Sequence, residues 1–524
     1  MTWIVLKEEN GKIKLVSKDG TDGMISKGAY LTIEEKTCKF ILRVDESGQT
    51  EPFEPSPLIV DMDISGIAAD RQCKNIVRAY RVKTIDESDD DDLVRYIRPL
   101  SVARRSTQEE IDDAMDSGKS GPKVFVATVF ANENRILRDD NKKYITACLP
   151  EEFYYHQTMI CGKTGSGKTV AMKYLAQYFA EEMNGAVLAI NVKGDDFLRM
   201  DQPSVPREDS KTAIEKEWKS MDRVAHGVKK FTIYHPANSE PKRYNSLSAN
   251  LTKITLNMSE IEPEALTGVL GNITDKAAES LPGIFRYWRE TQHEKRKPVT
   301  YIEFERYFSN NSSDRENRRT FGSRNERGDN TDVTLHAGTY QSVLTSISNA
   351  AIFFDNSNST MLKHDDILVE GKISVIDVSE KGGTLFGSLV LRDLLKRLVE
   401  AKEDSLVKLL IIIDEVHQFY NTGSARKSLD DLDTICRTGR HKEIGVFFAS
   451  QNPADMPSGL SSVVNTKIFF KTDIQSVKEI GIKVSSDELD GLKKGYAVAS
   501  IHDLPQLRVV KFPLSFGGVI DVKH

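Results

Sequence analysis

The chain is 524 residues long, with 39% hydrophobic and 29% charged residues, which is typical of a soluble globular protein of roughly two to four domains. Its 72 basic residues are outnumbered by 78 acidic ones, giving a net charge of −6. That balance excludes a uniformly basic coat for wrapping nucleic acid but is compatible with a local basic channel. No run approaches the length of a membrane span, no signal-peptide pattern opens the chain, and the five cysteines include no CxxC pair. These features predict a cytoplasmic protein without a membrane segment, a structural zinc site or a disulfide framework.

The first 80 residues contain short β-rich runs separated by turns that carry Gly, Asp and Glu. The expected strands are Thr2–Leu6, Lys12–Val16, Tyr30–Ile33, Lys39–Val44 and Leu58–Asp61. Their close spacing predicts a small antiparallel barrel or sandwich. The acidic run Asp86–Asp92 that follows is interpreted as a solvated loop.

A short helix is expected over Thr107–Ser117, with Ser106 or Thr107 as its cap and Glu109 or Glu110 near the third helical position. Two strands are expected after it, at Lys123–Phe130 and Tyr144–Leu149.

From Gln157 onward, apolar strands alternate with helices. The expected helix is Val170–Met183, and the expected strands are Thr158–Cys161, Ala186–Val192, Phe231–Tyr234, Ile373–Val378, Leu409–Ile413, Gly445–Ala449 and Lys467–Phe470. Continuous apolar strands between helices predict a parallel sheet covered on both faces.

Between about 250 and 350 the apolar strands stop. Helices are expected at Glu262–Leu270 and at Thr274–Gln292, the latter broken near Pro282. Asn310–Asp332 is rich in Asn, Arg, Ser and Gly and is expected to be a mobile loop. We interpret the region as a helical insertion.

The expected division of the chain has five parts. They are an N-terminal β-barrel with a linker (1–135), the first part of the α/β core (136–250), the helical insertion (251–350), the second part of the core (351–505) and a C-terminal tail (506–524).

The strongest motif is Gly162-Lys-Thr-Gly-Ser-Gly-Lys-Thr169, which matches G-x-x-x-x-G-K-[ST] and lies between an expected strand and an expected helix. Glycines let backbone N–H groups close around phosphate oxygens, and the helix N-terminus adds favourable dipole charge. Lys168 is expected to reach the β- and γ-phosphates of ATP, and the Thr169 hydroxyl to ligate Mg²⁺. The expected nucleotide-binding residues are Gly162, Lys163, Thr164, Gly165, Ser166, Gly167, Lys168, Thr169 and Val170.

The second motif is LLIIIDE, Leu409–Glu415, in which an apolar strand delivers two carboxylates at its carboxyl end. Asp414 is expected to hold the magnesium shell and Glu415 to act as general base on the attacking water. Together with the P-loop, this motif predicts nucleoside triphosphate hydrolysis and not binding alone.

Two further features follow. Gln451 comes directly after the strand Gly445–Ala449 and could sense the γ-phosphate or simply make a strand-end hydrogen bond. Arg437 and Arg440 belong to the basic turn RTGRHK before that strand. An arginine there could stabilise transition-state charge from a neighbouring subunit, and the alternative is a basic surface turn.

These four features, in this order, resemble the HerA/FtsK superfamily of hexameric P-loop ATPases, and HerA most closely. The matching stretches are CGKTGSGKT (161–169), AINVKGDDF (189–197), ISVIDVSE (373–380), LLIIIDEVHQF (409–419) and ICRTGRHKEIGVFFASQNPADM (435–456). The strand-rich N-terminus is similar in position and pattern to the HAS-barrel of HerA proteins. The resemblance implies an α/β fold: a RecA-like (ASCE) P-loop core with a mainly parallel sheet, preceded by a HAS-barrel-like domain.

The resemblance also implies a homohexameric DNA translocase or helicase, with ATP and Mg²⁺ at subunit interfaces and double-stranded DNA in the central pore. It further implies a partner, either a NurA-like nuclease in end processing or a sirtuin-like or nuclease effector in antiphage defence. By the same resemblance Gln451 takes the sensor role, Arg440 is the first choice for the trans-acting finger and Arg437 the second. The alternative is an ATPase ring that acts mainly as a scaffold and nucleotide-dependent switch.

The chain departs from the family pattern at two positions: Asn191 replaces a frequent acidic residue, and His441 replaces the usual lysine. DNA contacts are the least specified part, and the candidates are the Arg315–Arg327 loop and Arg286–Lys297, both of which also fit ordinary solvated surface. The β-rich C-terminal segment is expected either to reach over a neighbouring subunit or to form an edge strand.

Overall fold

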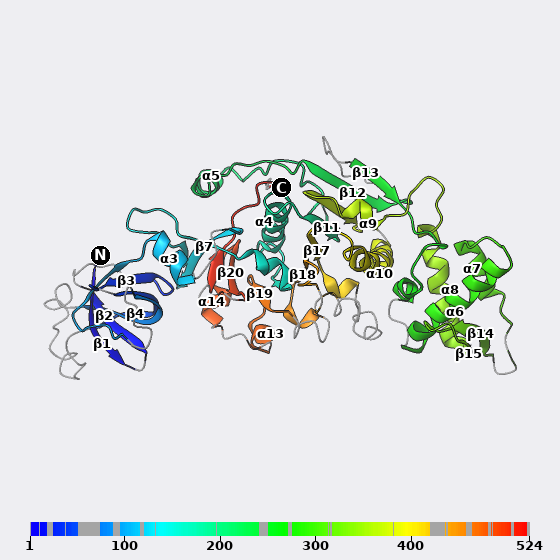
Figure 1. Cartoon of the computed structure of the whole chain (residues 1–524), viewed down its shortest axis with the longest axis horizontal. Helices are drawn as coiled ribbons and strands as arrows, with labels where there is room; N and C mark the ends of the chain where they lie inside the picture. The colour runs from blue at the N-terminus through cyan, green and yellow to red at the C-terminus, as the bar shows by residue number, and fades with distance from the viewer. Residues whose placement is uncertain are drawn as a thin grey trace, which may run out of the picture.

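A computed structural model of the chain describes residues 2–520 except 10, 18–24, 37, 51–73, 87–94, 116–119, 131–132, 195, 240–249, 271–274, 313, 315–316, 381, 420–434, 436, 438, 457–463, 480, 482–483, 485, 503 and 505–507. An N-terminal barrel, a central α/β core and a group of mainly helical elements lie in a row along the long axis (Figure 1). Within the described residues, none of the helices combines the length and apolarity that crossing a bilayer requires.

The expected barrel is confirmed. Six antiparallel strands close in the order β1-β2-β5-β4-β3-β6. Their bounds are β1 (Trp3–Glu9), β2 (Lys12–Ser17), β3 (Tyr30–Glu34), β4 (Cys38–Thr50), β5 (Lys74–Asp86) and β6 (Val102–Arg105). Trp3, Leu31 and Phe40 are almost fully buried inside it. The expected strand Leu58–Asp61 and most of the acidic run lie outside the described residues, while Asp86 itself ends β5.

Helix α3 (Gln108–Met115) fastens the barrel to the segment that follows it. Thr107 and Glu110 form the expected capping box, because Glu110 Oε2 accepts from the Thr107 N–H at 2.9 Å and Thr107 Oγ1 accepts from the Glu110 N–H at 3.3 Å. Glu110 also accepts from the Thr32 hydroxyl of β3 and from the Arg104 guanidinium of β6. Burial raises the pKa of Glu110, but these hydrogen bonds outweigh it and bring the value to about 2.

The core is one thirteen-stranded sheet in the order β13-β12-β16-β11-β17-β18-β10-β19-β20-β21-β7-β8, with β9 also paired to β7. Every pair from β13 to β19 is parallel, and every pair from β19 to β8 is antiparallel. The strands are β7 (Lys123–Phe130), β8 (Glu133–Ile136), β9 (Thr146–Cys148), β10 (Thr158–Cys161), β11 (Ala186–Asn191), β12 (Lys230–Pro236), β13 (Asn250–Ile254), β16 (Lys372–Asp377), β17 (Leu409–Ile413), β18 (Ile444–Ser450), β19 (Thr466–Phe469), β20 (Tyr496–Ser500) and β21 (Val509–Lys511). The expected mainly parallel sheet is therefore confirmed.

Both faces of the sheet are buried, which explains why its strands are continuously apolar. Leu410 and Ile412 of β17 pack in one apolar cluster with residues of α4 (Lys168–Glu181), whereas Leu409 and Ile411 pack in a second cluster with α10 (Gly383–Ala401). The remaining short elements of the core are η1 (Glu151–Tyr155), α5 (Lys211–Ser220), α9 (His364–Ile367), η4 (Val416–Gln418), η5 (Pro453–Asp455), α13 (Ile474–Glu479) and α14 (Ser486–Asp490).

The inserted region is mainly helical, as expected, but two of its predicted details are wrong. Its elements are η2 (Pro263–Leu270), α6 (Asp275–Glu294), α7 (Tyr301–Ser309), β14 (Arg319–Arg324), β15 (Asn330–Leu335), α8 (Ala337–Ala350) and η3 (Ala351–Phe353). Helix α6 continues through Pro282, because Leu281, Ile284 and Phe285 are buried on one face that spans the proline.

The second wrong detail is the expected mobile loop 310–332, much of which is the hairpin β14–β15. Asn325 and Gly328 make its turn, with Asn325 Oδ1 accepting from the Asp329 N–H at 2.8 Å and Gly328 at a φ of 92°. Phe321 anchors the hairpin by stacking on Phe308 of α7 at 4.7 Å. Leu335 of β15 is buried in the same apolar cluster, and Val333 packs against it.

Of the two expectations for the C-terminal segment, the edge strand is wrong. Strand β21 lies inside the sheet between β20 and β7, and the described residues after it pack on the chain's own core. Trp218 Nε1 donates to the Leu514 carbonyl at 2.8 Å, and the Gly517 N–H donates to Gln177 Oε1 of α4 at 2.9 Å.

Gly445 lies where β18 packs closely on η1. A Cβ at this position would lie 2.1 Å from the carbonyl oxygen of Tyr154, so Gly445→Ala is expected to destabilise the protein by about 1–3 kcal/mol through overpacking. Calorimetry should show a lower Tm. Gly338→Ala in α8 is the control, since a Cβ there meets nothing within 4 Å, and it should leave Tm unchanged or higher. An unchanged Tm for Gly445→Ala would contradict this packing.

Candidate nucleotide-binding site

The candidate site lies at the carboxyl edge of four neighbouring parallel strands, β11, β17, β18 and β10. The P-loop follows β10, Asp414 and Glu415 follow β17, and Gln451 follows β18. One strand, β18, separates the P-loop strand from the strand with the two carboxylates, as expected of a RecA-like core. Residues far apart in sequence meet here because parallel strands end at the same edge.

The P-loop is held by backbone contacts to the neighbouring strands. The Gly162 N–H donates to the Ser450 carbonyl at 3.2 Å, and the Lys163 N–H donates to the Lys471 carbonyl at 2.8 Å. Gly167 has a φ of 107°, and a Cβ on it would lie 2.7 Å from the backbone nitrogen of Gly495. This glycine is therefore required by both conformation and close approach.

A pocket with a volume of about 240 Å³ opens beside the P-loop. Its lining includes every predicted nucleotide-binding residue except Gly162 and Ser166, which are not part of the pocket wall, and it includes Asp414, Glu415 and Gln451. The predicted residues that line it are Lys163, Thr164, Gly165, Gly167, Lys168, Thr169 and Val170.

Glu415 is the most constrained side chain of the site. It is 2% exposed and has a φ of 48°, a left-handed conformation that costs a non-glycine residue about 1–3 kcal/mol. Its Oε1 accepts from Lys193 Nζ at 2.6 Å and from Gln451 Nε2 at 2.9 Å. Its Oε2 is buried and makes no hydrogen bond with the described residues. Two donors thus fix one carboxylate oxygen, while the other lies 3.6 Å from His417 Nδ1 without a hydrogen bond.

Lys168 lies between the P-loop and the two carboxylates. Its Nζ is 3.4 Å from Asp414 Oδ1 and 3.7 Å from Glu415 Oε1. Burial raises the pKa of Glu415, but the hydrogen bonds from Lys193 and Gln451 and the charge of Lys168 outweigh it, so the pKa is lowered overall. Glu415 is therefore ionised at neutral pH.

Three residues of the pocket were missed by the sequence analysis: Lys193, Asp196 and Lys494. Lys193 and Asp196 follow β11 at the same sheet edge, and that position was the available signal. Burial raises the pKa of Asp196 against the charge of Lys173, and the neighbouring charge of Asp414 adds to the rise. Lys494 precedes β20, and no local pattern indicates that this turn reaches the P-loop, where the Gly495 N–H donates to the Ser166 carbonyl at 2.9 Å.

Asn191, the departure from the family pattern, ends β11 next to the site. Its Nδ2 donates to Asp377 Oδ1 of β16 at 3.0 Å, and its Oδ1 accepts from the Phe197 N–H at 3.1 Å. The neighbouring strand therefore supplies a carboxylate beside the position where the family often has one.

Arg437 and Arg440 are not part of this pocket. Both are exposed and lie before β18, whereas the P-loop edge lies at the carboxyl end of that strand. Seven residues of extended chain span about 20 Å, so the two arginines are at the opposite edge of the sheet from the nucleotide pocket of their own chain.

Several basic side chains considered for DNA contact are held by other residues of the insertion. Arg286 forms an ion pair with Glu264, Arg289 Nη1 donates to the Ile261 carbonyl at 3.0 Å, and Arg319 stacks on Tyr340. Trp288 is 1% exposed and belongs to the core. Arg315 lies outside the described residues.

Comparison with known proteins agrees with this geometry. The family model described as "Helicase HerA, central domain" matches residues 141–399, and that described as "Helicase HerA-like C-terminal" matches residues 361–471. The fold and the site define a P-loop ATPase of the RecA-like class. The chain belongs to the HerA-like proteins.

Among curated proteins, a probable helicase of Methanocaldococcus jannaschii is 27% identical over 194 residues, which is 32% of this chain and 36% of that protein. The DNA double-strand break repair helicase HerA of Pyrococcus furiosus is 29% identical over 108 residues, 19% of this chain and 20% of that protein. The matches thus span about a third and a fifth of these relatives.

Among solved structures, the plasmid coupling protein TrwB with a non-hydrolysable ATP analogue is 11% identical, with a TM-score of 0.49 over 83% of this chain and 98% of that one. VirB4 of Thermoanaerobacter pseudethanolicus is 11% identical, with a TM-score of 0.44 over 76% and 97%. The family assignment rests on the sequence matches.

The ion pair between Lys193 and Glu415 can be tested by measuring thermal stability as a function of pH. Because the pKa of Glu415 lies below its ordinary value of 4.5, its ion pair adds stability above that pH, and this contribution is lost as pH falls through the lowered pKa. Lys193→Gln should therefore lower Tm most near neutral pH, and the difference from wild type should shrink on acidification below pH ~4.

The control is Lys163→Gln, which removes a cation from the same pocket without removing a contact to Glu415. Its effect on Tm should not follow the titration of Glu415. If the Lys193→Gln difference in Tm is the same at every pH, the ion pair does not govern the ionisation of Glu415.

Proposed function

We propose that the chain binds ATP with Mg²⁺ in the P-loop pocket and hydrolyses it. The observation that carries this proposal is Glu415, a buried and ionised carboxylate with Oε1 held by Lys193 and Gln451 and with Oε2 making no hydrogen bond. Such a group can accept the proton of an attacking water. Membership of the HerA-like family supports the same activity.

The residues around the pocket have the chemical groups needed to bind ATP and Mg²⁺. A Cβ at Gly167 would meet the Gly495 backbone, so the loop can keep this tight curvature only with glycine, and the first helical N–H groups of α4 have no acceptor within their helix. Lys168 supplies a cation for the phosphates. The hydroxyl of Thr169 and the carboxylate of Asp414 are the oxygen donors that Mg²⁺ prefers.

Different residues of the chain have different roles in hydrolysis. The P-loop N–H groups and Lys168 hold the phosphates and stabilise developing charge. Glu415 Oε2 takes the proton from water, while Lys193 and Gln451 orient the carboxylate through Oε1. A Mg²⁺ ion held by Thr169 and Asp414 would neutralise phosphate charge.

The position of Arg440 supports a ring. The nucleotide pocket of its own chain is at the other end of β18, so an arginine finger at this turn must act on a neighbouring subunit. We propose a homohexamer, as the family resemblance implies, with Arg440 as the finger and Arg437 as the second choice.

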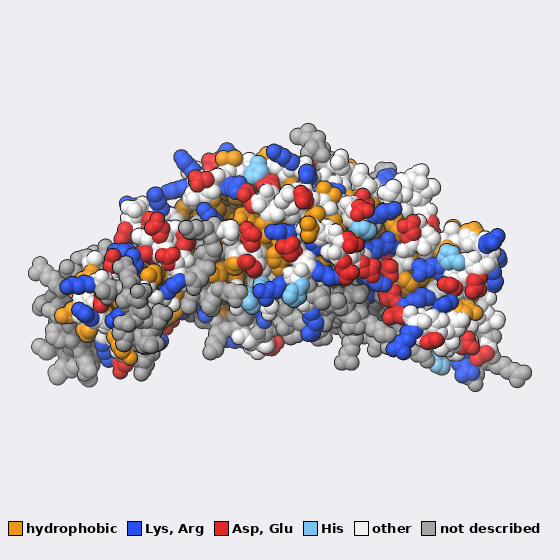
Figure 2. Space-filling model, viewed as in Figure 1, with side chains coloured by type: hydrophobic (Ala, Val, Ile, Leu, Met, Phe, Trp, Pro, Cys, Tyr) orange, Lys and Arg blue, Asp and Glu red, His pale blue; other side chains and the backbone are white. Residues whose placement is uncertain are grey.

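We further propose that the ring moves double-stranded DNA through its central pore. On the face seen in Figure 2, lysine and arginine side chains are interspersed with acidic ones over the described core and insertion, without an extended basic band. DNA would therefore be gripped by a few cations per subunit, repeated by the symmetry of the ring, with affinity that falls steeply with salt.

The proposed motor serves a nuclease or another effector enzyme in DNA end processing or antiphage defence. The support for this part is the family resemblance alone. Proteins that co-purify with the full chain from its own cells would identify the partner.

The decisive experiment measures ATP turnover with and without linear double-stranded DNA, at low and moderate salt. DNA is expected to stimulate turnover, more strongly at low salt. Lys168→Ala should lower the rate by roughly a hundredfold or more, because the phosphates lose their main cation. Wild-type turnover in that variant would sink the P-loop assignment. A rate indifferent to DNA would favour the ring as scaffold and switch.

Arg440→Ala should reduce turnover by on the order of a thousandfold while nucleotide binding is retained, because an arginine finger stabilises only the transition state. Mixing Arg440→Ala subunits with Glu415→Gln subunits should restore part of the activity. At some mixed interfaces an intact Glu415 then faces an intact Arg440 from the neighbour. No recovery at any mixing ratio would contradict a trans-acting role, and Arg437→Ala is the matched comparison.

A further inference from the structure

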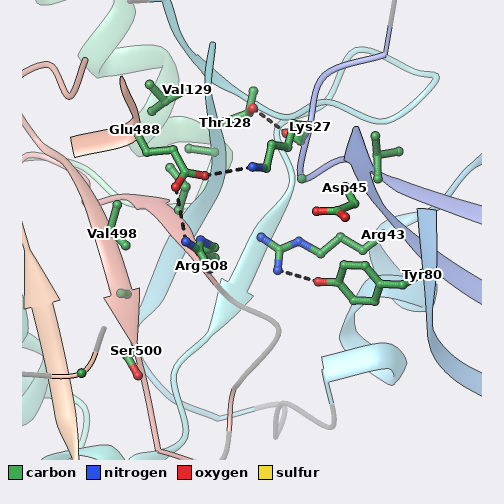
Figure 3. A pocket seen from close by; sticks show the side chains of 16 residues that line it. Lys27, Arg43, Asp45, Tyr80, Thr128, Val129, Glu488, Val498, Ser500 and Arg508 are labelled. Atoms are coloured by element: carbon green, nitrogen blue, oxygen red, sulfur yellow. Dashed lines mark hydrogen bonds and ion pairs between the residues drawn. The ribbon is translucent and has the colours of Figure 1, made fainter. Parts of the chain in front are cut away.

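A second pocket lies where the barrel meets the antiparallel end of the large sheet (Figure 3). Its volume is about 450 Å³, within the range of small-molecule sites. Strands β4 and β5 of the barrel form one wall, and β7, β20, β21 and α14 form the other. It shares no lining residue with the P-loop pocket.

Two arginines line this pocket from opposite walls. Arg43 extends from the barrel toward Arg508 of the core, whose guanidinium pairs with Glu488 (Figure 3). Lys27 adds a third cation from the loop before β3. Like charges that converge on one space repel each other unless an anion lies between them.

The carboxylates of the pocket are already engaged. Glu488 accepts from Lys27 at 3.3 Å and from Arg508 at 3.3 Å through its two oxygens. Asp45 pairs with Lys12 at 3.0 Å, outside the pocket lining. The lining therefore holds three cations and two carboxylates, both of which are bound by other side chains.

Arg43 is the side chain left without a counter-charge. It is 9% exposed, and among the described residues no carboxylate lies within 4 Å of it. The contact the structure shows is the donation from Nη1 to the Tyr80 hydroxyl at 3.0 Å. A buried cation paired only with a neutral hydroxyl is costly, so the site favours an anionic occupant.

The backbone is shaped to place this arginine. Arg43 lies between two irregularities in the pairing of β4 with β5, one at Ile41/Leu42 and one at Val44/Glu46. Such bulges redirect a side chain out of the regular pleat. Gly28 lies directly beside the guanidinium, because a Cβ there would be 3.8 Å from Arg43 Nη2.

We infer that this pocket binds a small phosphorylated ligand whose phosphate bridges Arg43 of the barrel and Arg508 of the core. A phosphate group offers several acceptor oxygens, and guanidinium groups bind such oxygens in pairs. The valines of β7 and β20 and the Tyr80 ring provide an apolar wall for the rest of the ligand. Because the two arginines belong to different domains, the ligand would tie the barrel to the core.

The test uses the full chain with Lys168→Ala, so that the P-loop no longer competes for phosphate. Inorganic pyrophosphate and AMP are titrated separately by calorimetry, and thermal unfolding is followed with each probe. We expect saturable binding of one molecule per chain and a higher Tm with the probe bound. Arg43→Gln and Arg508→Gln should each weaken binding at least tenfold and remove the rise in Tm.

Arg78→Gln is the matched control, because Arg78 is an exposed barrel arginine that pairs with Glu46 and does not line the pocket. It should bind the probes as the parent does. If Arg43→Gln does not fold, Arg508→Gln decides the outcome, since Arg508 is partly exposed.

Three results would overturn the inference. They are no saturable binding of either probe, binding that both arginine variants leave unchanged, and arginine-dependent binding of a DNA oligonucleotide without binding of pyrophosphate or AMP. The last result would assign the pocket to nucleic acid.

Discussion

The parallel pairing of β11, β17, β18 and β10 is the constraint on which the rest of the site depends. In-register parallel hydrogen bonding forces the four carboxyl ends to one edge, and each end delivers a different group: an orienting lysine, two carboxylates, an amide and a phosphate-binding loop. Antiparallel pairing of any one strand would carry its group to the far edge. The insertion leaves this edge intact because it begins after β13, the outermost strand, and returns to the amino end of β16.

Glu415 is buried at this edge of the sheet, and its ionisation depends on the groups around it. An isolated carboxylate at 2% exposure would be driven toward its neutral form. The hydrogen bonds from Lys193 and Gln451 and the charge of Lys168 prevent this. The three partners follow β11 and β18 or belong to the P-loop, so the charge of Glu415 depends on segments that are far apart in sequence. The same arrangement leaves Oε2 without a hydrogen bond.

Features that are determined by neighbouring residues could be predicted from the sequence, whereas features that depend on tertiary contacts could not. The P-loop, the apolar strand before Asp414 and the capping box at Thr107 are set by neighbouring residues, and all were predicted. Lys494 was missed because its place beside the P-loop depends on antiparallel pairing of β19 with β20. The hairpin β14–β15 is not indicated by local composition, because polar residues separate Phe321 in β14 from Val333 and Leu335 in β15. Helix α6 passes through Pro282 because tertiary packing outweighs one lost hydrogen bond.

The antiparallel half of the sheet has a mechanical consequence. From β10, which carries the P-loop, an unbroken ladder of backbone hydrogen bonds runs through β19, β20 and β21 to β7, the strand whose Thr128 hydroxyl donates to the Lys27 carbonyl beside the barrel. The barrel side and the P-loop strand are therefore connected by backbone hydrogen bonds across one continuous sheet, and not only by the segment of chain that joins β6 to β7.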